Sequence, residues 1–267
     1  MSFTVMEYRI RKELKFGLNS LVTARGKFLD YIELDLLFLK KGEKFTGRTQ
    51  GKEEVLVILA GQGKIDLGSG VSQTVGERKD VFGGKAWAIY VPFNHSYTLQ
   101  AIDNLEVAIA RAPSDLKADP VIVSPGEVKE RIVGKGNYER RVYDIVDLNI
   151  KAKHLVVGET VNPPGNWSSF PPHKHDIDNL PEEADLEEVY LFRVKPSPGF
   201  GLIRLYNDDL SLDKAYSLRD NDVMAIREGY HPVAAPPGYS LYYLWILAGE
   251  KRVLKPRDDP KHTWINK

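Results

Sequence analysis

The chain has 267 residues, in which 37 Lys and Arg balance 37 Asp and Glu, so its formal net charge at pH 7 is zero. A nucleic-acid-binding protein usually carries a basic excess, and a peripheral membrane protein carries a basic amphipathic segment, so this composition argues against both classes of partner. The absence of cysteine excludes disulfides and thiolate ligands, and no apolar run has the length of a signal peptide or membrane span, so we expect a cytoplasmic globular protein.

Short apolar runs bounded by turn residues recur along the first half of the chain. Residues 31–39 alternate, residues 55–60 precede Gly61-Gln62-Gly63, and residues 88–91 precede a proline. Runs of this kind, rich in β-branched and aromatic residues, predict strands and hairpins. The best candidate for a short helix is the stretch 128–133. The sequence therefore predicts a mainly β protein, built as a sandwich or a barrel.

A repeat relates the two halves of the chain. Three short segments recur in the same order and at nearly constant separation: Glu53-Glu54-Val55 and Glu187-Glu188-Val189, Ala88-Ile89 and Ala225-Ile226, His95 and His231. Such a pattern predicts two copies of one β-domain. Proline and glycine interrupt the pattern between them, so we place the domains at 1–125 and 126–267.

The second copy carries a constellation of histidines and glutamates. His173 and His175 form a His-x-His pair, Glu187-Glu188 opens the next apolar run, and His231 ends a Gly-Tyr-His sequence. Side chains two residues apart on a strand face the same way, so both imidazoles of the pair would point to one side. Three imidazoles and one carboxylate, with no thiolate, suit a catalytic divalent-metal site with open positions. We expect zinc first, with Mn, Fe, Co or Ni as alternatives.

This arrangement resembles the two sequence motifs of the cupin superfamily, with a longer spacing that implies an inserted loop over 176–185. The fuller pattern is similar to the 5-deoxy-glucuronate isomerase family of myo-inositol catabolism, in segments that span nearly the whole chain: Asp80-Val81-Phe82, Tyr90-Val91-Pro92, 166–176, 186–190, 199–201, 229–233, 242–245 and Ala248-Gly249. The resemblance implies a bicupin, with two β-barrel (jelly-roll) cupin domains in tandem. It also implies a metal-dependent aldose–ketose isomerase whose metal ligands are His173, His175, Glu188 and His231.

The choice between two adjacent glutamates follows from strand geometry. Neighbouring residues of a strand face opposite ways, so only one of Glu187 and Glu188 can join the metal. Glu188 directly precedes the Val-Tyr run, as in the related ketol isomerases, and Glu187 is the fallback.

The first copy lacks most of this constellation. Residues 40–49, where its His-x-His pair would stand, contain no histidine, and only Glu54 and His95 match ligands of the second copy. We therefore expect no tight metal site in the first domain, which would instead help to close the pocket or form a subunit interface.

The implied isomerisation moves a proton between adjacent carbons, so it needs a base beside the metal. Four side chains are candidates: Glu187, Asp176, Tyr190 and Tyr243. The carboxylate of a sugar-acid substrate needs a cation, and bidentate geometry favours arginine, so Arg193 and Arg204 are the candidate substrate-binding residues. A small sugar acid is the expected partner, and a homo-oligomer is left open.

Two other functions are compatible with the same ligands. One is a cupin Fe(II) dioxygenase, because fold and ligands do not fix the reaction. The other is a non-catalytic bicupin that binds a sugar acid as a sensor or store. Isomerase turnover without oxygen would exclude the dioxygenase, and binding without turnover would favour the sensor.

Overall fold

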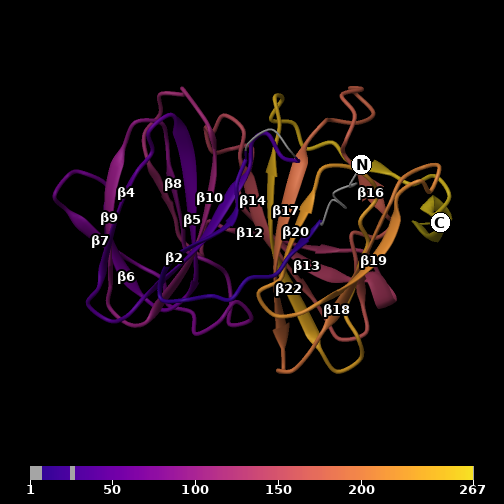
Figure 1. Cartoon of the computed structure of the whole chain (residues 1–267), viewed down its shortest axis with the longest axis horizontal. Helices are drawn as coiled ribbons and strands as arrows, with labels where there is room; N and C mark the ends of the chain where they lie inside the picture. Colours follow the sequence, from indigo (N-terminus) through magenta and orange to yellow (C-terminus); the bar gives the residue numbers. More distant parts are fainter. Residues whose placement is uncertain (1–7, 25–27, 267) are drawn as a thin grey trace, which may run out of the picture.

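The computed structural model describes residues 8–24 and 28–266. Residues 1–7, to which part of the expectation about a signal peptide refers, lie outside the described residues. Two β-sheet halves stand side by side along the long axis of the molecule, the first in indigo and magenta and the second in orange and yellow (Figure 1). Helical structure in the described residues is limited to the short 3₁₀ turns η1 (Gly136–Tyr138) and η2 (Thr263–Asn266). None of these helices has the length and apolarity needed to cross a membrane.

The first half consists of two antiparallel sheets. The six strands of the large sheet lie in the order β11 (Val121–Val123), β8 (Ala88–Val91), β5 (Lys52–Ala60), β10 (Leu105–Pro113), β3 (Glu33–Leu39) and β2 (Gly17–Val22). The four strands of the small sheet lie in the order β4 (Lys44–Arg48), β9 (Ser96–Ala101), β6 (Gly63–Asp66) and β7 (Ser72–Val75). Residues such as Leu56, Ile58 and Leu99 fill the space between the two sheets.

The second half repeats this plan. Its large sheet has the order β1 (Arg9–Ile10), β20 (Val223–Ile226), β17 (Glu187–Lys195), β22 (Ser240–Ala248), β14 (Val156–Asn162), β13 (Arg140–Val146) and β12 (Lys129–Val133). A four-stranded sheet has the order β15 (Trp167–Ser168), β21 (Val233–Ala234), β18 (Gly201–Tyr206) and β19 (Asp213–Leu218). A two-stranded sheet pairs β16 (His173–Lys174) with β23 (Arg257–Asp258). The chain passes from the first large sheet to the second between Val123 and Lys129. The pair Arg9–Ile10, expected in the first domain, instead lies at the edge of the second large sheet.

The continuous apolar runs of the sequence come from strands that are buried on both faces. Along β17, Tyr190 and Phe192 point into the second half, whereas Val189 and Leu191 pack against the large sheet of the first half. The strand β5 alternates in the same way. The two large sheets therefore share one apolar core between the halves, and each half has a second core inside.

The mainly β prediction is confirmed, whereas the predicted helix at 128–133 is wrong. Residues Lys129–Val133 form the edge strand β12, which pairs with β13 in antiparallel register. A segment this short cannot hold a helix by itself, and pairing with a neighbouring strand supplies the hydrogen bonds that it needs.

Candidate metal centre

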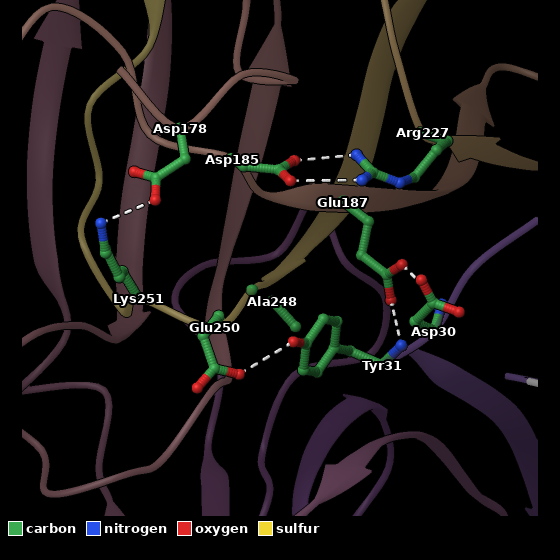
Figure 2. Close-up of a pocket in the computed structure, with 10 residues that line it drawn as sticks. Asp30, Tyr31, Asp178, Asp185, Glu187, Arg227, Ala248, Glu250 and Lys251 are labelled. Atoms are coloured by element: carbon green, nitrogen blue, oxygen red, sulfur yellow. Dashed lines mark hydrogen bonds and ion pairs between the residues drawn. The ribbon is translucent and has the colours of Figure 1, made fainter. Parts of the chain in front are cut away.

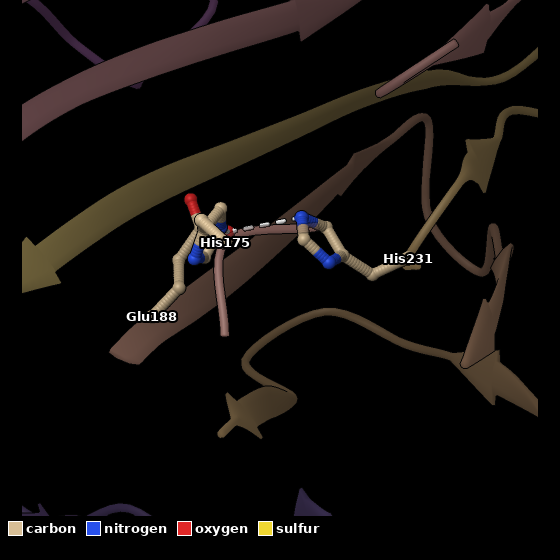
Figure 3. Close-up of side chains that lie close together, drawn as sticks. All are labelled: His175, Glu188 and His231. Atoms are coloured by element: carbon tan, nitrogen blue, oxygen red, sulfur yellow. Dashed lines mark hydrogen bonds and ion pairs between the residues drawn. The ribbon is translucent and has the colours of Figure 1, made fainter. Parts of the chain in front are cut away.

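Four predicted ligands come from three separate segments of the second half. His173 lies on β16 and His175 just after it, Glu188 is the second residue of β17, and His231 lies two residues before β21. Alternation along β17 turns Glu188 to the same side as Tyr190, into the second half. Figure 3 shows the imidazole of His231 directed at the carboxylate of Glu188, with His175 beside it.

The distances are those of a ligand cluster. One ligand atom from each of His175, Glu188 and His231 lies within 4.8 Å of the others, and all three residues are buried. The Nε2 atoms of His175 and His231 lie 3.1 and 3.2 Å from Oε2 of Glu188. The ring centroid of His173 lies 5.0 Å from that of His231, and His173 and Glu188 line one cavity. The structure thus brings all four side chains together.

Backbone carbonyls set the orientation of two imidazoles. Nδ1 of His175 lies 2.6 Å from the carbonyl oxygen of Leu186, and Nδ1 of His231 lies 2.9 Å from that of Gly229. Each Nδ1–H donates to its carbonyl, so in the neutral ring the Nε2 lone pair points towards Glu188. Nε2 of His231 is buried and has no hydrogen-bond partner among the described residues. Lone pairs that face a carboxylate repel it unless a cation lies between them, so this donor set fits a divalent metal ion.

The charges in the centre agree with this fit. Burial by itself would raise the pKa of Glu188, but the close approach of His175 and His231 outweighs burial and lowers the pKa to about 2. Burial lowers the pKa of His173, and the imidazoles of His231 and His175 lower it further. Burial also acts to lower the pKa of His175, but Glu188 raises it more. The cluster therefore holds an ionised carboxylate that attracts positive charge.

A cavity of about 330 Å³ opens beside the cluster, a size typical of small-molecule sites. Tyr190 and Tyr243 line it together, with ring centroids 4.6 Å apart. The hydroxyl of Tyr243 donates to Oγ of Ser168 at 3.0 Å. Burial, followed by the charge of Glu188, raises the pKa of Tyr190 well above its ordinary value, so its hydroxyl keeps its proton at neutral pH.

The structure does not bring the candidate base Glu187 to the histidines. Its carboxylate accepts three backbone N–H groups of the first half, those of Asp30, Tyr31 and Ile32, at 2.6 to 2.8 Å. Figure 2 shows Glu187 in a small pocket between the halves, next to Asp30 and Tyr31. Alternation along β17 makes this unavoidable, because Glu188 faces the other way. Glu187 is thus a contact between the two halves.

Asp176 likewise has a structural environment. Its carboxylate forms an ion pair with the buried Lys174 and accepts the N–H of Gly229 at 2.7 Å. It connects the segment after β16 to the segment before His231, and it lines a different cavity from Tyr190. These contacts position two ligand-bearing loops.

Neither predicted substrate-binding arginine lies in the wall of the 330 Å³ cavity. Arg193 is on the same face of β17 as Glu187, and it forms an ion pair with Glu106 of β10 in the first half. Arg204 is half-buried on β18 and pairs with Asp213 of β19 at 2.8 Å. Closeness in sequence to the Glu188 strand does not place a side chain on the inner face of that strand. A role of these two arginines in substrate binding stays a prediction.

Sequence reasoning missed an arginine that does line the cavity. Arg140 is the first residue of β13 and is buried, on the inward-facing side with Val142. No motif marks it. The available signal was an arginine at an alternating apolar position of a strand, but without the strand order nothing connected it to the histidines.

Comparison with known proteins agrees with the geometry. The KduI/IolB family model matches residues 11–265. A 5-deoxy-glucuronate isomerase of Geobacillus kaustophilus (strain HTA426) is 40% identical over 245 residues, which cover 91% of this chain and 89% of that protein.

Solved structures extend the similarity to the fold. An IolB-like protein from Salmonella typhimurium LT2 matches with a TM-score of 0.87 and 33% identity, covering 93% of this chain and all of the other. A cupin 2 conserved barrel domain protein from Leptotrichia buccalis matches with a TM-score of 0.51 and 14% identity, covering 90% of this chain and 91% of the other. The predicted fold class, a mainly β bicupin, is confirmed.

Proposed function

Because this chain belongs to the KduI/IolB family, we propose that it is a metal-dependent aldose–ketose isomerase that converts 5-deoxy-D-glucuronate to 5-dehydro-2-deoxy-D-gluconate. The observation that carries the proposal is the buried His175, Glu188 and His231 cluster at the wall of a ligand-sized cavity. The curated relatives are named for an isomerase acting on this sugar acid, and the similarity covers nearly the whole of both chains.

We assign His173, His175, Glu188 and His231 as the ligands of one divalent metal ion, with zinc as the first choice and Mn, Fe, Co or Ni as alternatives. Support comes from the Nε2 lone pairs that face the ionised Glu188. When bound, the metal supplies a Lewis acid that stabilises negative charge on the substrate carbonyl and its neighbouring hydroxyl.

The protein's own side chains hold and move the protons. Of the four candidate bases, only Tyr190 and Tyr243 line the cavity. Tyr190 has a protonated hydroxyl that can donate to a substrate oxygen as charge develops there. Ser168 fixes the hydroxyl of Tyr243. We therefore retain the two tyrosines for proton transfer and assign Asp176 and Glu187 to holding the loops and halves in place.

The apolar part of the wall limits water at the reacting carbons. Trp245 and Leu247 follow Tyr243 on β22, and Leu254 and Pro256 come from the segment before β23. An aldose–ketose isomerisation passes through an enediol when the proton leaves its first carbon. Excluding water strengthens electrostatic interactions with the substrate and protects this enediol from side reactions.

An anaerobic assay of the purified protein with 5-deoxy-D-glucuronate, combined with elemental analysis, tests the proposal. We expect ketose formation without oxygen, loss of turnover after chelation, and recovery when one of the candidate metals is returned. A product that forms only with oxygen would indicate a dioxygenase. Stoichiometric binding without turnover would indicate a sugar-acid-binding bicupin.

We extend the proposal to a cytoplasmic location, and we expect neither nucleic acid nor membrane as a partner. The balance of 37 basic and 37 acidic residues supports the expectation about these two partners. Light scattering in solution tests whether the chain forms a homo-oligomer.

A further inference from the structure

Arg140 is a buried cation without a carboxylate partner among the described residues. Its Nη1 donates to the carbonyl oxygens of Tyr138 and Phe170, at 3.1 and 3.0 Å. Its Nε and Nη2 form no hydrogen bond to any residue that the structure describes. Asp258 on β23 is close enough for charge interaction with Arg140, but the two form no ion pair. One edge of the guanidinium is therefore available to a ligand.

Other arginines near the site are already neutralised. Arg131 also lines the cavity, but Asp144 holds it through two hydrogen bonds of 2.7 and 2.8 Å. Away from the cavity, the deeply buried Arg78 is paired in the same bidentate way with Glu159. An unpaired buried charge is costly, and burial lowers the pKa of Arg140, yet an arginine stays charged in proteins. The structure thus keeps a desolvated positive charge in a ligand-sized cavity.

Arg140 and Glu188 line the same cavity from two different strands of one sheet. Two strands, β14 and β22, separate β13 from β17. Arg141 is in register, through Val161 and Tyr242, with Arg193, so Arg140 lies level with the far end of β17 from Glu188. The side chains of Arg140 and Glu188 point inward from these strands, and Tyr190 and Tyr243 lie between them in the same wall.

We propose that Arg140 binds the carboxylate of the sugar-acid substrate, while the His and Glu cluster faces the carbonyl end of the same molecule. The identity of this anion rests on the proposed function. A carboxylate can accept two parallel hydrogen bonds from the free edge of a guanidinium, and this geometry fixes the long axis of the substrate. The cavity would thereby select a sugar acid over the corresponding neutral sugar.

Calorimetric binding of D-glucuronate and its uncharged amide, D-glucuronamide, to the metal-loaded protein tests this subsite. We expect wild type to bind glucuronate at least tenfold more tightly than the amide. Arg140→Gln keeps a donor for the two backbone carbonyls and should reduce this preference to less than about twofold. Arg131→Gln is the matched control, because it removes a cavity arginine that is already paired, and it should keep the preference. An unchanged preference in Arg140→Gln would overturn the assignment.

A second measurement does not depend on the variant folding. Phenylglyoxal modifies accessible arginines, and peptide mass analysis of the wild-type protein identifies the site. We expect glucuronate to protect Arg140 and glucuronamide to leave it reactive. Equal modification of Arg140 in the presence of either sugar would contradict the proposal.

The two measurements separate this inference from the proposed function. A wild-type protein that isomerises 5-deoxy-D-glucuronate but shows no Arg140-dependent preference retains the function and loses the subsite. A protein without isomerase activity, but with a preference for glucuronate that Arg140→Gln removes, retains the subsite and loses the function.

Discussion

The two halves neutralise the same inward-facing carboxylate in different ways. In the second half, Glu188 faces two imidazoles and an open cavity. In the first half, the equivalent Glu54 accepts hydrogen bonds from Tyr97 at 2.7 Å and from Arg111 at 2.8 Å. One half keeps a place for a cation, and the other supplies the cation from its own chain.

Strand register shows which residues replace one another. Arg111 faces Glu54 across the β5 and β10 pair, in the position that Leu247 takes opposite Glu188. A leucine leaves the carboxylate without a protein partner on that side, whereas the arginine fills the space and adds an ion pair with Asp35. A single strand position thus distinguishes a cavity from a packed interior.

Glu53 and Glu187, each of which directly precedes the inward-facing glutamate of its half, both bind backbone N–H groups of the other half. Glu53 accepts the N–H groups of Lys153, His154 and Leu155 from the second half, at 2.7 to 2.9 Å. This matches the contact of Glu187 with the first half. The Glu-Glu pair of the repeat therefore combines one residue that joins the halves with one that faces its own interior.

We expect the largest effect from removing a metal ligand of the second half. His231→Ala removes a ligand, so we expect the purified variant to lose its metal and kcat/KM to fall on the order of 1000-fold, because a bound metal supplies several kcal/mol. Elemental analysis and the isomerase assay measure this, with circular dichroism as the folding control. His173→Ala should behave alike. Stoichiometric metal in both variants would refute the ligand assignment.

Arg111→Leu gives the first half the residue found in the second. It leaves Glu54 and Asp35 buried without their cation, so we expect the free energy of unfolding to fall by about 3–5 kcal/mol in chemical denaturation. The control, Arg111→Leu with Glu54→Leu, should recover part of this loss because it removes one of the two uncompensated charges. A change below about 1 kcal/mol for the single variant would show that the pairing has little energetic role.

Glu187→Gln and Glu53→Gln test the contacts that join the halves. Each loses charge-assisted acceptance of three N–H groups, and we expect each to lower the free energy of unfolding by about 2 kcal/mol. Neither lines the 330 Å³ cavity, so kcat/KM of the folded fraction should stay within about twofold of wild type. If Glu187→Gln lost turnover at unchanged stability, Glu187 would return as a candidate base.

His95→Ala should have the smallest effect. Nδ1 of His95 lies 3.0 Å from the carbonyl oxygen of Phe93, and losing that hydrogen bond costs about 1 kcal/mol or less. Metal content and activity should be retained. A metal-depleted His95→Ala protein would mean that the first half also contributes to metal binding.

Patterns over a few neighbouring residues were enough to predict the mainly β fold class and to identify candidate metal ligands. His173 and His175 are close in the chain, and alternation alone separates Glu187 from Glu188. The same rule explains why both glutamates are buried for different reasons. The relative direction of side chains one or two residues apart on a strand depends only on that strand, so it can be predicted without knowing the rest of the fold.

Features set by register and strand order could not be read from the chain. The sequence match of His95 to His231 is wrong by two residues. Ile65 on β6 and Ile203 on β18 are equivalent, and they pair with Leu99 and Val233. Two residues before these partners lie Tyr97 and His231, so Tyr97 is the structural equivalent of His231. Arg140 reaches the cavity only because three strand pairings place β13 in the sheet that carries Glu188. These relations depend on loop lengths and long-range pairing.

The shared core between the large sheets explains why the first half is still needed, although its described residues form no metal cluster. Tyr90 and Val57 of the first half and Val189 and Leu244 of the second belong to the same buried cluster. Expressed alone, residues 126–267 would present one side of that layer to water. Catalysis can therefore be confined to one half, whereas both halves contribute side chains to the shared apolar layer. Substitutions in that layer are constrained in either half, because each must still pack against the other.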